Sequence, residues 1–206
     1  MVNVQSLDTK ESKAAGTIVS ALANPGPLGL TGFGMTTVLL NLLNGGLIAS
    51  TGLGMILAMG IFYGGLAQVI AGILEFRRGN TFGTVAFTSF GFFWISLVTI
   101  LLFPKMGLAS APDGVSMAAY LAIWGLFTAY MFVATLNKNR AIQFVFGSLV
   151  VLFALLAVAD FTGIAWVKTL AGYEGIICGL SAIYLAFAEV VNETYGRELV
   201  PIGKVS

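Results

Sequence analysis

The residues best able to do chemistry in this chain are amides and hydroxyls that interrupt long apolar runs. Thr37, Asn41 and Asn44 follow one another at steps of four and three residues, which places them on one face of a helix. Gln68 lies in the middle of a second apolar run. Such uncharged groups can hydrogen-bond a polar solute or a neighbouring helix, but they supply no nucleophile with its base.

Further hydroxyls occur in the apolar runs around residues 90 and 146, where Thr84, Thr88, Ser89 and Ser148 lie. For any single residue of this kind, a hydrogen bond between two helices is the simpler interpretation. Taken together, and with no lysine or arginine deep in any apolar run, these residues favour a polar conduit through a membrane.

The composition indicates an integral membrane protein without enzymatic machinery. The 206 residues are 58% hydrophobic and 9% charged, whereas soluble proteins carry about 25% charged residues. The chain has no histidine and one cysteine, which excludes histidine-dependent dyads and multi-cysteine metal sites. With a net charge of +1 it has no basic footprint for nucleic acid. We therefore expect neither an enzyme nor a metal, a cofactor or a nucleic-acid partner.

Six apolar segments are long enough to cross a bilayer, which takes about 20 residues. The segments are 28–49, 53–76, 82–103, 114–136, 141–162 and 171–193. The predicted fold is an all-α integral membrane protein with a six-helix transmembrane domain over residues 24–195. Residues 1–23 and 196–206 are predicted to be an N-terminal and a C-terminal tail, both cytoplasmic.

The distribution of basic residues predicts the orientation. With six spans both termini lie on one side, together with most of the 10 lysines and arginines. That side would hold Lys10, Lys13, Arg77, Arg78, Lys138, Arg140, Arg197 and Lys204, and the other side Lys105 and Lys168. Because basic loops stay inside, both termini are expected to be cytoplasmic, in the cell (inner) membrane.

Two carboxylates lie near the predicted cytoplasmic ends of spans. Glu75 precedes Arg77 and Arg78, and Glu189 comes one turn before the end of the last span. A carboxylate inside a membrane is a candidate for a proton relay. Glu75 is expected at the cytoplasmic interface, and for Glu189 solvation at the interface or pairing with an arginine is the simpler interpretation.

A weak internal repeat suggests how the spans are arranged. Phe-Gly pairs begin at Phe33, Phe90 and Phe146 in the odd-numbered spans, at nearly equal intervals. Motifs that start with Gly-Leu begin at Gly65, Gly125 and Gly179 in the even-numbered spans. The repeat predicts three helix hairpins around a pseudo-threefold axis, with the odd spans lining a central path. Phe33 and Phe90 would then form an apolar neck.

Several long motifs resemble the acetate uptake transporter family. The stretch "NPGPLGLTGFGMTTVLLNL" is similar to the family signature, and "LAMGIFYGGLAQVIAGILEFRRGNTFG", "QFVFGSLVVLFALL" and "ICGLSAIYLAFAEVVNE" follow in the family's order. The resemblance covers almost all of residues 24–203. The signature motif comprises Asn24, Pro25, Gly26, Pro27, Leu28, Gly29 and Leu30, with Gly26 where alanine is usual.

The resemblance implies a homohexamer of six-helix protomers, each with its own path for acetate and often succinate. The family's constriction falls on Phe33, Phe90 and Leu149, where Phe90 replaces the usual tyrosine. The lost hydroxyl would make the neck more apolar and favour acetate over the doubly charged succinate. Substrate contacts carried over from the family are Asn24, Thr36, Thr37, Asn41, Gln68 and Ala182.

The resulting hypothesis is a membrane permease or channel for acetate, and for succinate or other small carboxylates, with proton-linked uptake. Neutral donors without a fixed cation would bind an anion weakly enough to release it. A channel for small neutral solutes such as urea, amides, ammonia or water is the alternative. The same polar path with an apolar neck would serve it equally well.

Overall fold

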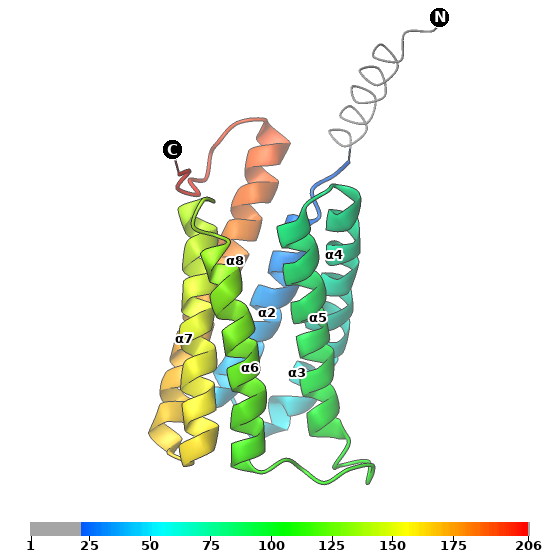
Figure 1. Cartoon of the computed structure of the whole chain (residues 1–206), viewed down its shortest axis with the longest axis vertical. Helices are drawn as coiled ribbons and strands as arrows, with labels where there is room; N and C mark the ends of the chain where they lie inside the picture. The colour runs from blue at the N-terminus through cyan, green and yellow to red at the C-terminus, as the bar shows by residue number, and fades with distance from the viewer. Residues whose placement is uncertain (1–21, 206) are drawn as a thin grey trace, which may run out of the picture.

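The computed structural model describes residues 22–205, so most of the predicted N-terminal tail 1–23 lies outside the described residues. The described chain is a bundle of helices without strands (Figure 1). Six helical segments are long and apolar enough to cross a membrane, as predicted. They are α2 (Gly26–Asn44), a composite segment (Ser50–Arg77), α5 (Thr81–Leu102), α6 (Gly114–Val133), α7 (Arg140–Thr162) and α8 (Ala165–Tyr195).

Two spans differ in length from the prediction. The first ends at Asn44 rather than at position 49, because Gly46 takes a φ of 73° and turns the chain. The last begins at Ala165 rather than at position 171, because α7 ends at Gly163 in a left-handed conformation and α8 starts almost at once. Lys168 therefore lies in α8, where it pairs with Asp160 at 2.7 Å.

The second span is not a uniform α-helix. A 3₁₀ turn, η1 (Ser50–Gly52), precedes α3 (Leu53–Ile61), and a π-helical segment, η2 (Phe62–Ala67), connects α3 to α4 (Gln68–Arg77). A π turn widens a helix locally and leaves its carbonyls open to other donors. Nothing in the hydropathy of the segment predicted this interruption.

Each even-numbered span packs mainly against the odd-numbered span that follows it around the bundle. The composite second span packs on α5, α6 on α7, and α8 on α2, while α5 and α6 barely touch although they are consecutive in sequence. In Figure 1, α6 and α7 form one side of the bundle, and α4 and α5 form the other. This cyclic pairing agrees with the pseudo-threefold arrangement that the repeat predicted.

The Phe-Gly repeat has a direct structural meaning. A Cβ atom added to Gly34 would lie 2.6 Å from the carbonyl oxygen of Gly179 on α8, and one added to Gly91 would lie 2.8 Å from that of Gly65. The glycines of the first two pairs thus pack closely against the backbone of an outer helix, whereas a Cβ atom on Gly147 would meet only the Phe132 ring of α6, at 3.3 Å. The preceding phenylalanine consequently turns inward, and Phe33, Phe90 and Phe146 all belong to the buried core.

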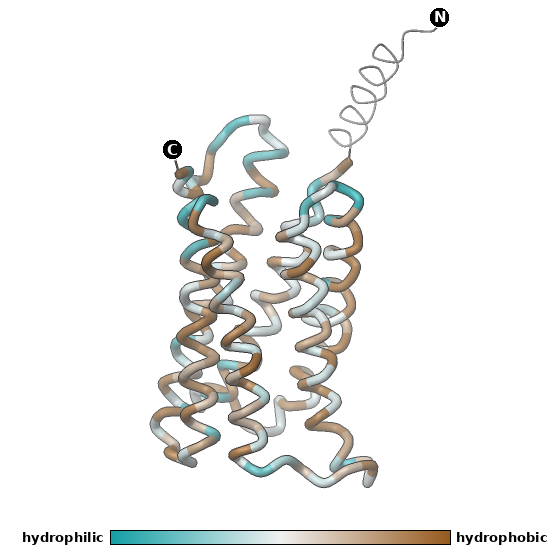
Figure 2. The backbone as a smooth tube through the Cα atoms, viewed as in Figure 1, coloured by the Kyte–Doolittle hydropathy of each residue, from teal (hydrophilic) through white to brown (hydrophobic). Residues whose placement is uncertain are grey.

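Hydrophilic residues gather at the two ends of the bundle, and apolar residues fill its middle (Figure 2). Many large apolar side chains are also exposed on the outer faces, including those of α6, which is the least buried span. A water-facing surface would not carry so many of them. The outer faces therefore suit contact with lipid or with other protomers.

Candidate functional site

A cavity of about 480 Å³ opens at the end of the bundle where α2 begins. We call it the vestibule. Its walls come from α2, α4, α5, α7, α8, the α6–α7 connection and the C-terminal segment. The polar and charged residues that line it are Asn24, Glu75, Asn80, Asn137, Lys138, Asn139, Glu189 and Lys204.

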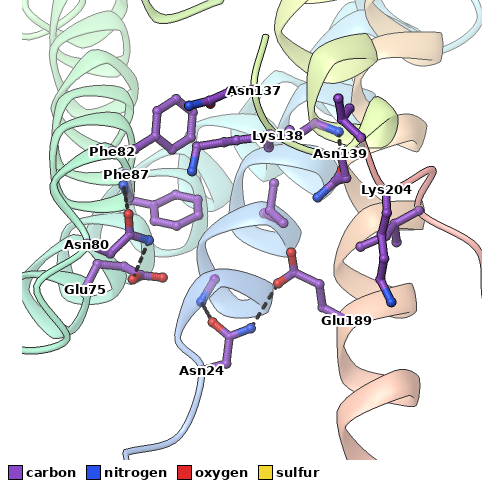
Figure 3. A pocket seen from close by; sticks show the side chains of 16 residues that line it. Asn24, Glu75, Asn80, Phe82, Phe87, Asn137, Lys138, Asn139, Glu189 and Lys204 are labelled. Atoms are coloured by element: carbon purple, nitrogen blue, oxygen red, sulfur yellow. Dashed lines mark hydrogen bonds between the residues drawn. The ribbon is translucent and has the colours of Figure 1, made fainter. Parts of the chain in front are cut away.

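The two acids of the vestibule are held by amides. Asn24 donates from Nδ2 to Oε2 of Glu189 at 3.1 Å, and Asn80 donates from Nδ2 to Oε2 of Glu75 at 2.8 Å. Figure 3 shows Asn24 between the two carboxylates. Glu75 is only 3% exposed, so it is not the solvated interfacial residue that was expected. Arg78 donates to Oδ1 of Asn24 at 2.8 Å and thereby fixes that amide.

Two lysines also line the vestibule, and they differ in their partners. Lys138, from the α6–α7 connection, places Nζ 4.9 Å from the centroid of the Phe82 ring. Lys204 pairs with Glu198 at 2.7 Å. The hydrogen bond and charge of Lys204 hold the pKa of the Glu198 carboxyl below its ordinary value. Among the described residues, Lys138 forms no ion pair, so its charge remains available to an anion.

The C-terminal segment forms part of the vestibule wall. Its carbonyls at Ile202 and Gly203 accept the backbone N–H groups of Ala141 and Arg140 at 3.0 and 2.7 Å. These are the first donors of α7, which have no partner within the helix. The side chain of Asn192 in α8 holds the same segment through both Leu199 and Val200. Residues 199–203 are thus packed against the bundle.

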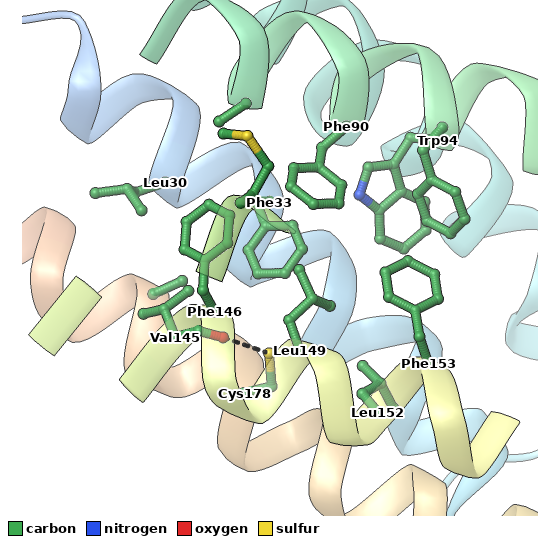
Figure 4. Packing of buried hydrophobic residues seen from close by; sticks show 14 of the residues in the cluster. Leu30, Phe33, Phe90, Trp94, Val145, Phe146, Leu149, Leu152, Phe153 and Cys178 are labelled. Atoms are coloured by element: carbon green, nitrogen blue, oxygen red, sulfur yellow. Dashed lines mark hydrogen bonds between the residues drawn. The ribbon is translucent and has the colours of Figure 1, made fainter. Parts of the chain in front are cut away.

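A second, much smaller cavity of about 30 Å³ adjoins the vestibule and is almost entirely apolar. We call it the neck. All three predicted constriction residues, Phe33, Phe90 and Leu149, line it. The rings of Phe33 and Phe90 have centroids 6.0 Å apart, and Figure 4 shows both beside Leu149. At about 30 Å³, the neck is far smaller than the vestibule of about 480 Å³.

Gln68 is the one polar side chain that lines the neck. It follows η2 directly, and its Nε2 donates to the carbonyl of Gly64 in that π-helical segment at 2.6 Å. The π turn therefore fixes the amide that the sequence singled out. One N–H of Nε2 is engaged in this way, so the second N–H and the amide oxygen remain available.

The polar face of α2 is largely used in helix packing. Asn41 donates to the carbonyl of Thr37 at 2.9 Å and accepts from Asn44 at 3.1 Å, beside Gly175 of α8. Thr36 packs against Gly64 of η2. The hydroxyls of Thr36 and Thr37 are buried without a partner among the described residues. None of these side chains lines the vestibule or the neck.

Ala182 lies on α8 in the buried core, with no exposed surface, and does not line either cavity. Ser148 bonds to Glu174 between α7 and α8, and Thr88 packs against Gly72 of α4. These contacts are the helix-to-helix kind that was the simpler interpretation of each residue. Within residues 22–205, no group of three His, Cys, Asp or Glu side chains is placed to hold a metal ion.

Comparison with known proteins gives consistent matches. The model of the GPR1/FUN34/yaaH family matches residues 8–201. The succinate-acetate/proton symporter SatP of Escherichia coli K12 is 59% identical over 183 residues, covering 89% of this chain and 96% of SatP. A solved structure described as the bacterial acetate channel SatP superposes with a TM-score of 0.86 and 59% identity, over 88% of this chain and 99% of that one.

Fungal proteins are more distant relatives. Acetate permease A of Emericella nidulans is 32% identical over 87% of this chain and 65% of its own length. Ammonia transport outward protein 2 of Saccharomyces cerevisiae is 38% identical over 84% of this chain and 64% of its own length.

Proposed function

Because the chain belongs to the GPR1/FUN34/yaaH family, we propose that it is a membrane permease for acetate that also accepts succinate or other small carboxylates. The observation that carries this proposal is the neck beside the vestibule. Aromatic and aliphatic side chains leave a space of about 30 Å³, which must widen for any solute and least for a two-carbon one. The relatives named for acetate provide independent support.

The vestibule is suited to collecting a carboxylate before it reaches the neck. Lys138 carries a positive charge that no carboxylate neutralises within residues 22–205, whereas the ammonium group of Lys204 is paired with Glu198. A positive charge on one wall of a cavity raises the local concentration of anions beside it. We propose that acetate is drawn to this wall, away from the two glutamates opposite.

We further propose that uptake is proton-linked. Glu75 and Glu189 place two carboxylates in the vestibule, each held by an asparagine rather than by a cation. Groups of this kind can take up and release a proton as the substrate passes. The word symporter in the name of the bacterial relative supports the same reading.

The remaining site assignments follow from the resemblance and the geometry together. Phe33, Phe90 and Leu149 form the constriction, and Gln68 offers its amide to the substrate inside the neck. Asn24 connects Glu189 and Arg78 at the vestibule by donating to the first and accepting from the second. The buried helix contacts around the path contain the other four residues that the resemblance assigns, namely Thr36, Thr37, Asn41 and Ala182.

We propose that the protein is a homohexamer in the cell (inner) membrane with both termini in the cytoplasm. The exposed apolar faces of the outer helices offer enough surface for contacts with other protomers and with lipid. The vestibule end, which carries Arg77, Arg78, Lys138 and Arg140, would face the cytoplasm. Residues 24–195 would form the membrane domain, with 1–23 and 196–206 as its cytoplasmic extensions.

The test is uptake of labelled acetate into liposomes that contain only this purified protein, with pH gradient and membrane potential clamped separately. Empty liposomes correct for the diffusion of acetic acid. Accumulation driven by an inward-directed proton gradient at zero potential would support proton coupling. Flux that follows only the acetate gradient and the potential would identify an anion channel and contradict the coupling.

A channel for small neutral solutes is not favoured by the comparisons, although one distant yeast relative is named for ammonia transport. The same liposomes distinguish the two functions. Permeation of urea or ammonia that is insensitive to acetate, together with no acetate flux above empty liposomes, would overturn the proposal.

A further inference from the structure

A third cavity, of about 650 Å³, lies between α5 and α6 at the end of the bundle away from the vestibule. We call it the groove. One wall comes from the stretch between Phe92 and Phe103 and the other from the first turns of α6, and the connection between the two helices closes its end. In Figure 1 that connection crosses the space between the ends of α5 and α6. No residue of the groove lines the vestibule or the neck.

The depth of the groove matches one leaflet of a bilayer. Because α5 is long and apolar enough to span the membrane, the groove runs from the membrane surface, where α5 ends, toward the middle. A helix rises about 16 Å from Phe92 to Phe103, at ~1.5 Å per residue. Half of the hydrocarbon core is about 15 Å thick. An occupant of the groove therefore lies within a single leaflet.

The hydroxyls in the depth of the groove are already used within the protein. Oγ of Ser96 and Oη of Tyr120 lie 2.7 Å apart, and they lie 2.9 and 3.2 Å from the carbonyl oxygen of Phe93. Thr99 donates to the carbonyl of Ile95 at 2.7 Å. The walls consequently present mainly hydrocarbon to an occupant, which suits an apolar chain better than a polar solute.

Two charges of opposite sign lie at the rim of the groove. Lys105 follows Pro104 of the groove wall, and Asp113 follows Pro112, and both charged side chains are exposed. Neither forms an ion pair within residues 22–205. Hydrogen bonds from Ser116 hold the pKa of the Asp113 carboxyl below its ordinary value, so this group is charged at neutral pH.

We propose that the groove binds an acyl chain of a zwitterionic phospholipid with a primary ammonium group, such as phosphatidylethanolamine, from the leaflet opposite the vestibule. The acyl chain lies between α5 and α6, the phosphate lies at Lys105 and the ammonium group at Asp113. The two charges of such a headgroup match the two charges of the rim, and its chain matches the depth and the apolar walls. The lipid thereby fills the space between two consecutive spans that barely touch each other.

A second copy of this chain fits the groove less well. A transmembrane helix is about 10 Å wide, which is too broad to enter a space of about 650 Å³ over this depth. It would lie across the opening and leave the groove unfilled. An anionic lipid without an ammonium group would pair with Lys105 but be repelled by Asp113.

The direct test locates the lipid by photo-crosslinking. The purified full chain in detergent micelles is given phosphatidylethanolamine with a diazirine in one acyl chain, and labelled peptides are mapped by mass spectrometry. We expect saturable labelling of residues 92–104 and 116–120. Unlabelled phosphatidylethanolamine should compete about threefold better than phosphatidylglycerol, the scale of one exposed ion pair. Labelling spread evenly over all exposed apolar faces, or absent from the groove because a second copy covers it, would overturn the proposal.

Two kinds of variant separate the acyl chain from the headgroup. Thr99→Trp fills the groove and should abolish labelling there. Ile123→Trp, on the 67% exposed side chain of α6, is the matched control and should leave labelling unchanged. Asp113→Asn retains a residue that caps a helix well and should remove the preference for phosphatidylethanolamine over phosphatidylglycerol, whereas Lys105→Gln should lower labelling by both lipids.

Each part of the proposal has its own contradicting result. Equal labelling of the groove in Thr99→Trp and the unmodified protein would contradict the acyl-chain site. An unchanged lipid preference in Asp113→Asn, measured on protein that elutes as the unmodified protein does, would contradict the assignment of the headgroup. The readout is lipid binding, so it does not depend on whether the protein carries acetate.

Discussion

Lys138 places its ammonium group 4.9 Å from the centroid of the Phe82 ring, and Phe82 lines both the vestibule and the neck. The same aromatic ring packs on Phe146 at 5.3 Å. A positive charge thus lies against an aromatic ring that is shared by the vestibule and the neck. Under the proposed function, an anion attracted to Lys138 would be held beside the entrance to the neck.

Replacement of Lys138 by glutamine should slow acetate flux from the vestibule side several-fold, because the local attraction for the anion is lost. The effect should shrink as ionic strength rises, since salt screens the same attraction in the unmodified protein. Flux measured at low and high ionic strength checks this. Lys105→Gln, at the opposite end of the bundle, is the matched control, and an equal effect of both changes would count against a local role for Lys138.

Phe33→Ala and Phe90→Ala should widen the neck and relax its selection by size. Both rings are buried and face each other across the cavity. Competition of succinate and longer monocarboxylates with acetate should increase at least about twofold, because the apolar barrier to larger solutes falls. Phe144→Ala changes a side chain of α7 that is 55% exposed, away from the neck, and controls for effects of losing any phenylalanine. If selectivity were unaltered in both neck variants, Phe33 and Phe90 would not form the constriction.

Phe90→Tyr restores the hydroxyl that the family usually has at this position. The ring of Phe90 packs edge-on against Phe127 at 5.2 Å and lies 6.1 Å from Phe146, so an added hydroxyl would meet few acceptors there except the substrate. We expect succinate uptake to rise relative to acetate uptake. Equal ratios in the two proteins, measured with labelled substrates, would show that this hydroxyl has no part in selectivity.

The close contact of α2 with α8 should make Gly179 intolerant of even a methyl group. A Cβ atom there would lie 2.7 Å from the carbonyl oxygen of Gly34, a backbone atom that cannot move alone. Gly179→Ala should cost about 1–3 kcal/mol of stability by overpacking. Thermal unfolding of the purified protein measures it. Gly54→Ala, where a Cβ atom would meet nothing within 4 Å, should be neutral, and a similar loss there would refute the packing explanation.

The ion pair of Glu198 with Lys204 should contribute to stability only when the glutamate is charged. Because the folded protein lowers the pKa of Glu198 from its ordinary value of 4.5, this contribution is complete above that value. It is lost as the pH falls through the lower pKa of the folded state. The difference in Tm between the unmodified protein and Glu198→Gln should be constant near neutral pH and decline toward zero in acid. A difference that grew in acid would contradict the assignment.

Much of the architecture could be predicted from the sequence, because burial in a bilayer leaves a strong trace in composition. Apolar runs long enough to cross a bilayer marked all six spans. The Phe-Gly pairs predicted which phenylalanine side chains face the core. Helix ends were less predictable. Where α2 stops depends on the backbone conformation of Gly46, and hydropathy carries no information about that.

The site was harder to predict, because its functional geometry depends on contacts between distant segments. Nothing in the sequence around Ile202 indicates that its carbonyl meets the first turn of α7. The π-helical η2 and the role of Gly64 are likewise products of packing. A single tryptophan in an apolar helix likewise gives no sign that the N–H of Trp94 is buried without a partner among residues 22–205.

The attachment of residues 199–203 to the first turn of α7 has a consequence for biogenesis. The ribosome synthesises these residues after all six spans, so α7 must enter the membrane with its first two N–H groups still open. The wall of the vestibule is therefore completed only after residues 199–203 have followed the six spans out of the ribosome.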